Sequence, residues 1–135
     1  MVAGHTDSTD FPGMGAIAAQ VGNAGSLDGV VARLNANLTV LEQATYIGGA
    51  GLDRITALAL DVAGNVVVAG YTASTNLPVT TGGAQPSNAG GLSDGFVTRI
   101  SADLLAISNQ TINFPAQANQ AYIVGGTFAI SPLAT

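Results

Sequence analysis

Short apolar runs separated by glycine-rich turns extend along most of the chain. The run Val66–Thr72 is rich in β-branched residues and follows the turn pair Gly64-Asn65, which predicts a strand. Its continuous apolar character predicts burial on both faces. A second run, 55–61, precedes it so closely that only a tight hairpin fits between them, with Gly64 and Asn65 at positive φ.

The same pattern predicts four more strands, at 2–6, 29–34, 39–47 and 95–101. A helix is poorly supported. Residues 16–21 could form one turn, but the corresponding segment 82–87 reads Gly-Gly-Ala-Gln-Pro-Ser. Short strands that follow one another in meander order predict an all-β chain of antiparallel strands.

The chain contains an internal repeat with an offset of 66 residues. Segment 2–12 matches segment 68–78 at 7 of 11 positions, and segment 28–38 matches segment 94–104 at 6 of 11. The stretches between them agree only at Ala18/Ala84 and Gly25/Gly91. Two shared strand blocks around a loop of fixed length and free sequence indicate packed strands and an exposed loop.

Such strands could form a sandwich, a barrel or a propeller. A repeat about as long as one four-stranded sheet favours a β-propeller, whose blades stack face to face. We expect a partial blade at 1–49, a second blade at 50–108 and a C-terminal β segment at 109–135. Because a propeller needs more blades than this, we expect the chain to be a piece of a longer protein. A free-standing small β-domain is the alternative.

The composition excludes several classes of protein. Hydrophobic residues make up 47% of the chain and charged residues only 8%, which is unlike a disordered protein. Three arginines and no lysine cannot form the basic face that nucleic acid requires. The absence of cysteine excludes disulfides and thiolate zinc sites. No apolar run approaches the ~18 residues of a membrane helix, and the N-terminus has no secretory-signal pattern.

Two separated motifs carry a family resemblance: Asp61-x-x-Gly64-Asn65-Val66-Val67-Val68-Ala69-Gly70-Tyr71-Thr72-x-Ser74-Thr75-x-x-Pro78, and Gly90-Gly91-x-x-Asp94-Gly95-Phe96-Val97-x-Arg99. With the linking segment 45–49, they resemble the bacterial SBBP repeat, named for a seven-bladed β-propeller. The resemblance covers about residues 1–104 and implies blades of a large secreted or cell-surface bacterial protein, with no catalytic residues. Segments 109–115 and 122–131 more weakly resemble the start of a bacterial Ig-like surface module.

The candidate chemical groups all have a simpler structural interpretation. Asp61 and Asn65 could begin a calcium loop, but such a loop needs five or six oxygens, so a turn in which Asp61 bonds local backbone is preferred. Asp7 and Asp10 form a carboxylate pair, yet the second copy has uncharged residues there. His5 could form a dyad with Asp7 or Asp28, but one histidine without cysteine cannot make a usual zinc site.

Several residues are expected to have structural roles because both copies of the repeat contain them. Arg33 and Arg99 occupy one repeat position, with Asp28 and Asp94 five residues earlier, which indicates an ion pair at a blade edge, or else an anion site. The remaining structural turn and repeat residues are Asp61, Gly64, Asn65, Gly70, Pro12 and Pro78.

The expected function is a non-catalytic, secreted or cell-surface scaffold or binding module without metal or cofactor. Its partners would be the rest of the parent propeller and a protein or glycan ligand at the loops 13–27 and 79–93, and tolerated surface insertions are the alternative interpretation of those loops. One alternative function is a fragment of a propeller enzyme acting on polysaccharide, although Glu42 is the only glutamate. Another is an adhesin or spacer segment.

Overall fold

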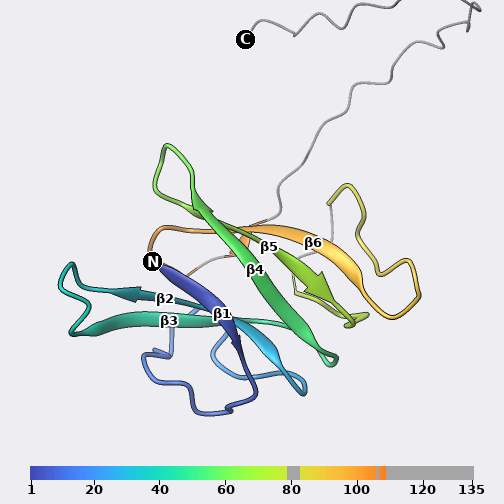
Figure 1. The fold of residues 1–135 in the computed structure, drawn as a ribbon, viewed down its shortest axis with the longest axis horizontal. Coiled ribbons are helices and arrows are strands. Elements are labelled where there is room, and N and C mark those ends of the chain that lie inside the picture. Colours follow the sequence, from blue (N-terminus) through green and yellow to red (C-terminus); the bar gives the residue numbers. More distant parts are fainter. Residues whose placement is uncertain (79–82, 106, 109–135) are drawn as a thin grey trace, which may run out of the picture.

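The computed structural model describes residues 1–78, 83–105 and 107–108, the last two by their backbone alone. This part of the chain forms seven strands in two antiparallel sheets and contains no helix (Figure 1). The first sheet has the order β1-β2-β3, with β1 at Val2–Thr6, β2 at Asp28–Leu34 and β3 at Leu41–Ile47. The prediction of an all-β, antiparallel chain is confirmed.

The second sheet has the order β4-β5-β6-β7. Its strands are β4 at Asp53–Leu60, β5 at Val66–Thr72, β6 at Asp94–Ile100 and the short β7 at Ile107–Ser108. The expected Ig-like segment 109–135 lies outside the described residues, and so do residues 79–82 of the second loop.

Two strand boundaries differ from the prediction because hydrogen bonds hold the neighbouring residues. β3 begins at Leu41 rather than at 39, since the Asn35 side chain accepts the N–H groups of Thr39 at 2.9 Å and Val40 at 3.2 Å. β4 begins two residues early, at Asp53, whose N–H donates to the Leu27 carbonyl oxygen at 2.7 Å. The other boundaries agree to within one residue.

The β4–β5 hairpin forms as predicted, but only one of its two turn residues has positive φ. Gly64 has a φ of 82°, whereas Asn65 is not in the left-handed region. Asn65 instead acts through hydrogen bonds to Asp61, from its backbone N–H at 2.8 Å and from its side-chain amide at 2.9 Å. The position therefore needs a short amide side chain rather than an unusual backbone conformation.

The two copies of the repeat have the same strand register. β1 pairs with β2 from Val2↔Ala32 to Thr6↔Asp28, and β5 pairs with β6 in a ladder that includes Val68↔Thr98 to Thr72↔Asp94. Adding 66 to every residue number of the first ladder gives the corresponding pair of the second. The sequence repeat is therefore also a repeat of backbone pairing.

The turn that follows each of these ladders is also repeated. Leu38 and Leu104, which are 66 residues apart, have φ angles of 58° and 57°. The N–H of Leu38 donates to the Asn35 carbonyl oxygen at 3.0 Å, and the N–H of Leu104 donates to Ser101 at 2.9 Å. Leucine is an unusual residue in this conformation, so sequence patterns did not predict it.

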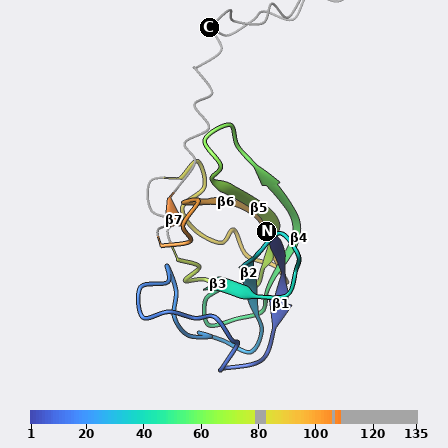
Figure 2. The same ribbon diagram turned by 90° about the vertical axis from the view of Figure 1, so that its left-hand side faces the viewer.

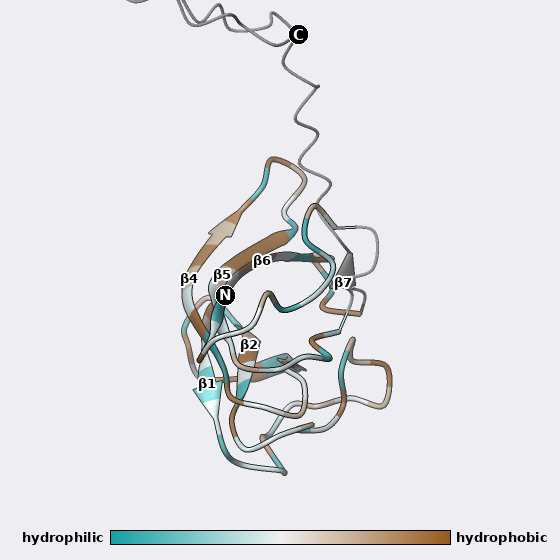
Figure 3. Ribbon diagram, turned by 90° about the vertical axis from the view of Figure 1, so that its right-hand side faces the viewer, coloured by the Kyte–Doolittle hydropathy of each residue, from teal (hydrophilic) through white to brown (hydrophobic). Residues whose placement is uncertain are grey.

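The core lies between the two sheets and brings together their inner faces. Val31 and Ile47 of the first sheet contact apolar residues of the second, in a cluster that also includes Ile55, Val66, Val68, Ile100 and Leu104. Each fully buried aliphatic side chain contributes about 1.5–3 kcal/mol. The hydropathy colouring shows hydrophobic residues along β4 and β5, on the second sheet (Figure 3).

The two faces that meet in the core are not equivalent in the repeat. Val31 lies on the inner face of the first sheet, but its counterpart Val97 lies on the outer face of the second sheet and is 56% exposed. Conversely, Val68 of the second inner face corresponds to Val2, which is 50% exposed. The prediction that β5 is buried on both faces is therefore wrong: Val67 is only half-buried, because no described sheet covers that face.

We predict that Gly29→Val destabilises the protein by about 1–3 kcal/mol, because the new side chain overpacks the core. A Cβ at Gly29 would lie 2.8 Å from the Ile55 side chain and 3.0 Å from the Ile47 carbonyl oxygen. Gly95→Val is the matched control, since a Cβ there meets only the Gly70 carbonyl oxygen at 3.9 Å. Urea unfolding of both variants measures the effect, and equal losses of stability would contradict the packing of Ile55 on Gly29.

Candidate functional site

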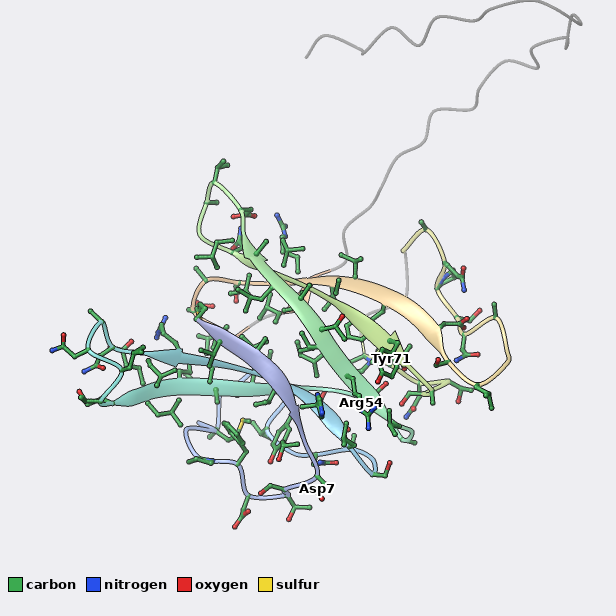
Figure 4. All side chains as sticks on the ribbon, in the orientation of Figure 1. Asp7, Arg54 and Tyr71 are labelled. Carbon is green, nitrogen blue, oxygen red and sulfur yellow. The ribbon has the colours of Figure 1, made fainter. Side chains whose placement is uncertain are left out.

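The exposed residues that the sequence offered as catalytic or metal-binding candidates, Asp7, Asp10 and His5, do not form a site together. Asp7 lies just beyond the end of β1 (Figure 4), and Asp10 accepts a hydrogen bond from the Ser8 hydroxyl at 2.6 Å. His5 is an exposed residue of β1. Within the described segments, no three His, Cys, Asp or Glu side chains lie close enough together to hold a metal ion.

Asp61 closes the β4–β5 hairpin and pairs with Arg99. Its Oδ1 atom accepts the N–H groups of Ala63 at 2.9 Å and Asn65 at 2.8 Å, and its Oδ2 atom lies 3.7 Å from the Arg99 guanidinium. The Asn65 side-chain amide is the main reason that the pKa of Asp61 is lowered. These contacts are those of a turn.

Arg33 and Arg99 pair with carboxylates, but not with the aspartates five residues before them. Arg33 lies 3.2 Å from Glu42 and donates to the Gln43 side chain at 3.0 Å and to the Ala102 carbonyl oxygen at 3.2 Å. The last of these bonds links the first sheet to the turn after β6. Asp28 and Asp94 begin their strands and bind the preceding loops instead.

The loop 13–27 covers the outer edge of β3. Gly13 accepts the N–H of Ala44 at 2.8 Å, and the Gln20 carbonyl oxygen accepts the N–H of Tyr46 at 3.1 Å. Figure 2 shows this blue segment along the β3 side of the first sheet. The buried Tyr46 also holds the preceding turn, because its hydroxyl donates to the Ser8 carbonyl oxygen at 2.8 Å and accepts the N–H of Phe11 at 2.9 Å. An edge strand that is covered in this way cannot pair with another chain.

Gln20 and Asp28 fix the end of that loop on the sheet. The Gln20 amide donates to Asp28 Oδ2 at 2.9 Å, and its Oε1 atom accepts the N–H of Gly48 at 3.1 Å. Asp28 Oδ2 also accepts the N–H of Ala24 at 2.9 Å. Burial raises the pKa of Asp28, and the negative charge of Asp53 raises it further, although the hydrogen bond from Ala24 opposes this change.

The connection between the two sheets is held by side chains of the second sheet. Asp53 Oδ2 accepts the N–H of Gly49 at 2.7 Å and the Ser74 hydroxyl at 2.6 Å. Ser74 Oγ in turn accepts the N–H of Gly51 at 2.8 Å, and Asn76 accepts the N–H of Ala50 at 2.8 Å. Each of these three acceptors bonds a backbone N–H group, so the network positions the loops.

Asp28 and Asp53 are the two buried carboxylates of the described residues. Both side chains are fully buried, and the Oδ1 atom of each has no hydrogen-bond partner. In the sequence, Asp28 is a repeat residue and a possible partner of His5, and Asp53 is not a candidate, because the proximity of the two aspartates depends on how Gly48 and Gly49 join the two sheets. No spacing in the sequence indicates that proximity.

The second loop repeats part of the first, shifted by one residue along the chain. Asn23 Oδ1 accepts the N–H of Gly25 at 3.0 Å, and Asn88 Oδ1 accepts the N–H of Gly90 at 2.7 Å. Ala89 donates to Asp94 at 2.6 Å, as Ala24 does to Asp28. These Asn-Ala-Gly segments have an offset of 65 rather than 66, so an ungapped comparison at offset 66 does not detect them.

No protein-family model matches the chain, and no curated protein or solved structure matches it. Within the described residues, no helix has the length and apolar character of a membrane span.

We predict that Ser74→Ala lowers the free energy of unfolding by about 1–3 kcal/mol, because it removes the buried hydrogen bond from the Ser74 hydroxyl to Asp53 and leaves the half-buried N–H of Gly51 without its acceptor. Ser8→Ala is the matched control at the same repeat position. Its hydroxyl bonds only the exposed Asp10 and so contributes less than about 0.5 kcal/mol. Urea denaturation compares the two, and a loss in Ser8→Ala as large as that in Ser74→Ala would contradict the network.

We predict opposite pH trends for Asp28→Asn and Asp61→Asn. Because the pKa of Asp28 is raised on folding, its contribution to stability is present at low pH and is lost as the pH rises through the folded pKa. Asp28→Asn should therefore gain stability relative to the wild type as the pH rises above the ordinary pKa of an aspartate. The pKa of Asp61 is lowered, so Asp61→Asn should lose relative stability as the pH rises over the acid range. Urea unfolding across this range tests both, and parallel trends would contradict the assignment.

Proposed function

We propose that this chain is a non-catalytic repeat module, in which similar β-sheets stack face on face and serve as a scaffold and binding surface. The observation that carries the proposal is the shared register of the two sheets, combined with the unlike faces that they join. The inner face of the first sheet corresponds to the outer face of the second. A further sheet of the same repeat can therefore pack on the outer face of the second sheet through the same kind of contact.

A contact between unlike faces has a predictable consequence for assembly. Head-to-tail contacts continue until the rotation per unit closes a ring, or else they form an open array. A ring of such sheets is a β-propeller, which agrees with the resemblance of residues 1–104 to the bacterial SBBP repeat. On that resemblance, we place the parent protein outside the bacterial cell, as a secreted or surface protein.

The binding surface in this proposal consists of the loop residues that the sheets leave exposed. Ile17 is 70% exposed and Leu92 is 96% exposed, and each lies in one of the two long loops. Apolar side chains on anchored loops suit a protein or glycan partner, because both offer apolar surface for such contacts. The anchoring supports a scaffold: Gln20 and Asp28 hold the first loop, and Asp94 holds the second.

We predict that a loop variant, Ile17→Ser with Leu92→Ser, loses ligand binding while its stability changes little. Labelled chain would be applied to a glycan array and to extracellular protein fractions, with hydrolase and lyase assays on the same polysaccharides. The matched control is Val62→Ser, which removes an even more exposed apolar side chain from the β4–β5 hairpin. Binding that persists in the loop variant, or turnover of any polysaccharide, would overturn the proposal.

A further inference from the structure

We propose that the outer edge of β1, together with the turn at residues 6–10, is an acceptor site for one further β-strand with the sequence pattern of residues 48–60. The inference deepens the proposed function and depends on it, since such a strand would come from another unit of the same repeat. Its occupant is defined chemically: a glycine-rich segment, followed by an aspartate, an arginine and alternating small and aliphatic residues.

The position of this strand follows from the repeat. In the second sheet, β4 pairs with β5 from Asp53↔Thr72 to Leu60↔Val66. β1 is the counterpart of β5, but it is the last strand of its sheet, and no described strand pairs with its outer edge. β4 runs near β1 (Figure 1) without joining its ladder.

Gly70 and Gly4, which occupy the same repeat position, indicate where the backbone of the additional strand would lie. At Gly70, a Cβ would overlap the carbonyl oxygen of Arg54, so the bulged backbone of β4 can approach β5 only because this residue is glycine. Gly4 occupies the same repeat position, and a Cβ there meets nothing within 4 Å. Glycine weakens a strand unless a close backbone approach requires it. The open space at Gly4 matches the backbone of an absent β4-like strand.

The neighbouring side chains agree with this vacant position. Tyr71 contacts the arginine of β4: its hydroxyl accepts from Arg54 at 2.7 Å, and the guanidinium lies 5.7 Å from the ring centre (Figure 4). His5, at the position of Tyr71, is exposed. The residue that binds Arg54 of β4 in the second sheet thus has an exposed counterpart in the first.

The turn after β1 carries the polar half of the site. Ser74 and Asn76 accept the backbone N–H groups of Gly51 and Ala50, which precede β4. Their counterparts Ser8 and Asp10 bond to each other at 2.6 Å. The preceding bond is the same in both copies, since the N–H of Ser8 donates to Thr6 Oγ1 at 3.0 Å and that of Ser74 to Thr72 at 2.9 Å. The first turn therefore has the geometry of the second, and its acceptors face solvent.

The site on β1 differs from its counterpart on β5 in charge. The first copy has Asp7 and Asp10 where the second has Ala73 and Asn76, so the site on β1 is the more acidic of the two. Main-chain pairing along an exposed edge supplies the affinity in such strand addition, and the side chains supply the specificity.

The test uses the full chain and a labelled peptide with the sequence of residues 48–60, Gly-Gly-Ala-Gly-Leu-Asp-Arg-Ile-Thr-Ala-Leu-Ala-Leu. We expect saturable 1:1 binding by fluorescence anisotropy and slower hydrogen exchange of the β1 amides. A scrambled peptide is the control for non-specific association. Gly4→Val fills the space that the peptide backbone needs, so it should weaken binding by at least about tenfold. It should also leave the chain folded, because nothing contacts that position.

Ser8→Ala with Asp10→Ala is the second variant, and it removes the polar acceptors without touching the core. It keeps the test decisive if Gly4→Val unfolds, which circular dichroism would show. Absence of peptide binding to the wild type would overturn the inference, and so would equal binding to both variants, since the peptide would then bind elsewhere. Failure of the proposed function would appear instead in the loop variant on the glycan and protein ligands, which this peptide assay does not measure.

Discussion

The contact between the inner faces of the two sheets is the interaction on which the rest of the structure depends. A sheet of three or four short strands gains stability only when it buries an apolar face, and here Val31 and Ile47 are buried against Ile55 and its neighbours. Gly29 permits this contact, because any side chain there would meet Ile55. The chain therefore cannot be divided between its sheets without exposing the core.

A polar connection keeps that contact in one arrangement. The N–H groups of residues 48–51, between β3 and β4, are bound by the side chains of Gln20, Asp53, Ser74 and Asn76, which come from both copies of the repeat. Buried carboxylates are costly unless they are hydrogen-bonded, and one oxygen of each of Asp28 and Asp53 is bonded in this way. Apolar burial holds the sheets together, and these directional bonds fix how they are joined.

The sequence predicted the strands well because their β-branched runs and the 66-residue offset are local signals. The shared register of β1–β2 and β5–β6 follows from the same blocks, since one-residue slips would move Val31 or Val68 out of the core. What could not be predicted depends on contacts between distant residues. The covering of β3 by Gly13 and Gln20 and the proximity of Asp28 to Asp53 have no local pattern. The left-handed leucines, Leu38 and Leu104, contradict the usual residue preference for that conformation.

Because unlike faces meet in the core, Ile55 of β4 packs against Gly29 of the first sheet and not against Gly95, its counterpart in the second sheet. A nuclear Overhauser effect between the Gly29 α protons and the Ile55 δ1 methyl group tests this claim most directly. The account predicts a strong effect at Gly29 and none at Gly95. An effect from Ile55 to Gly95, or none to either glycine, would contradict the head-to-tail stacking of the two sheets.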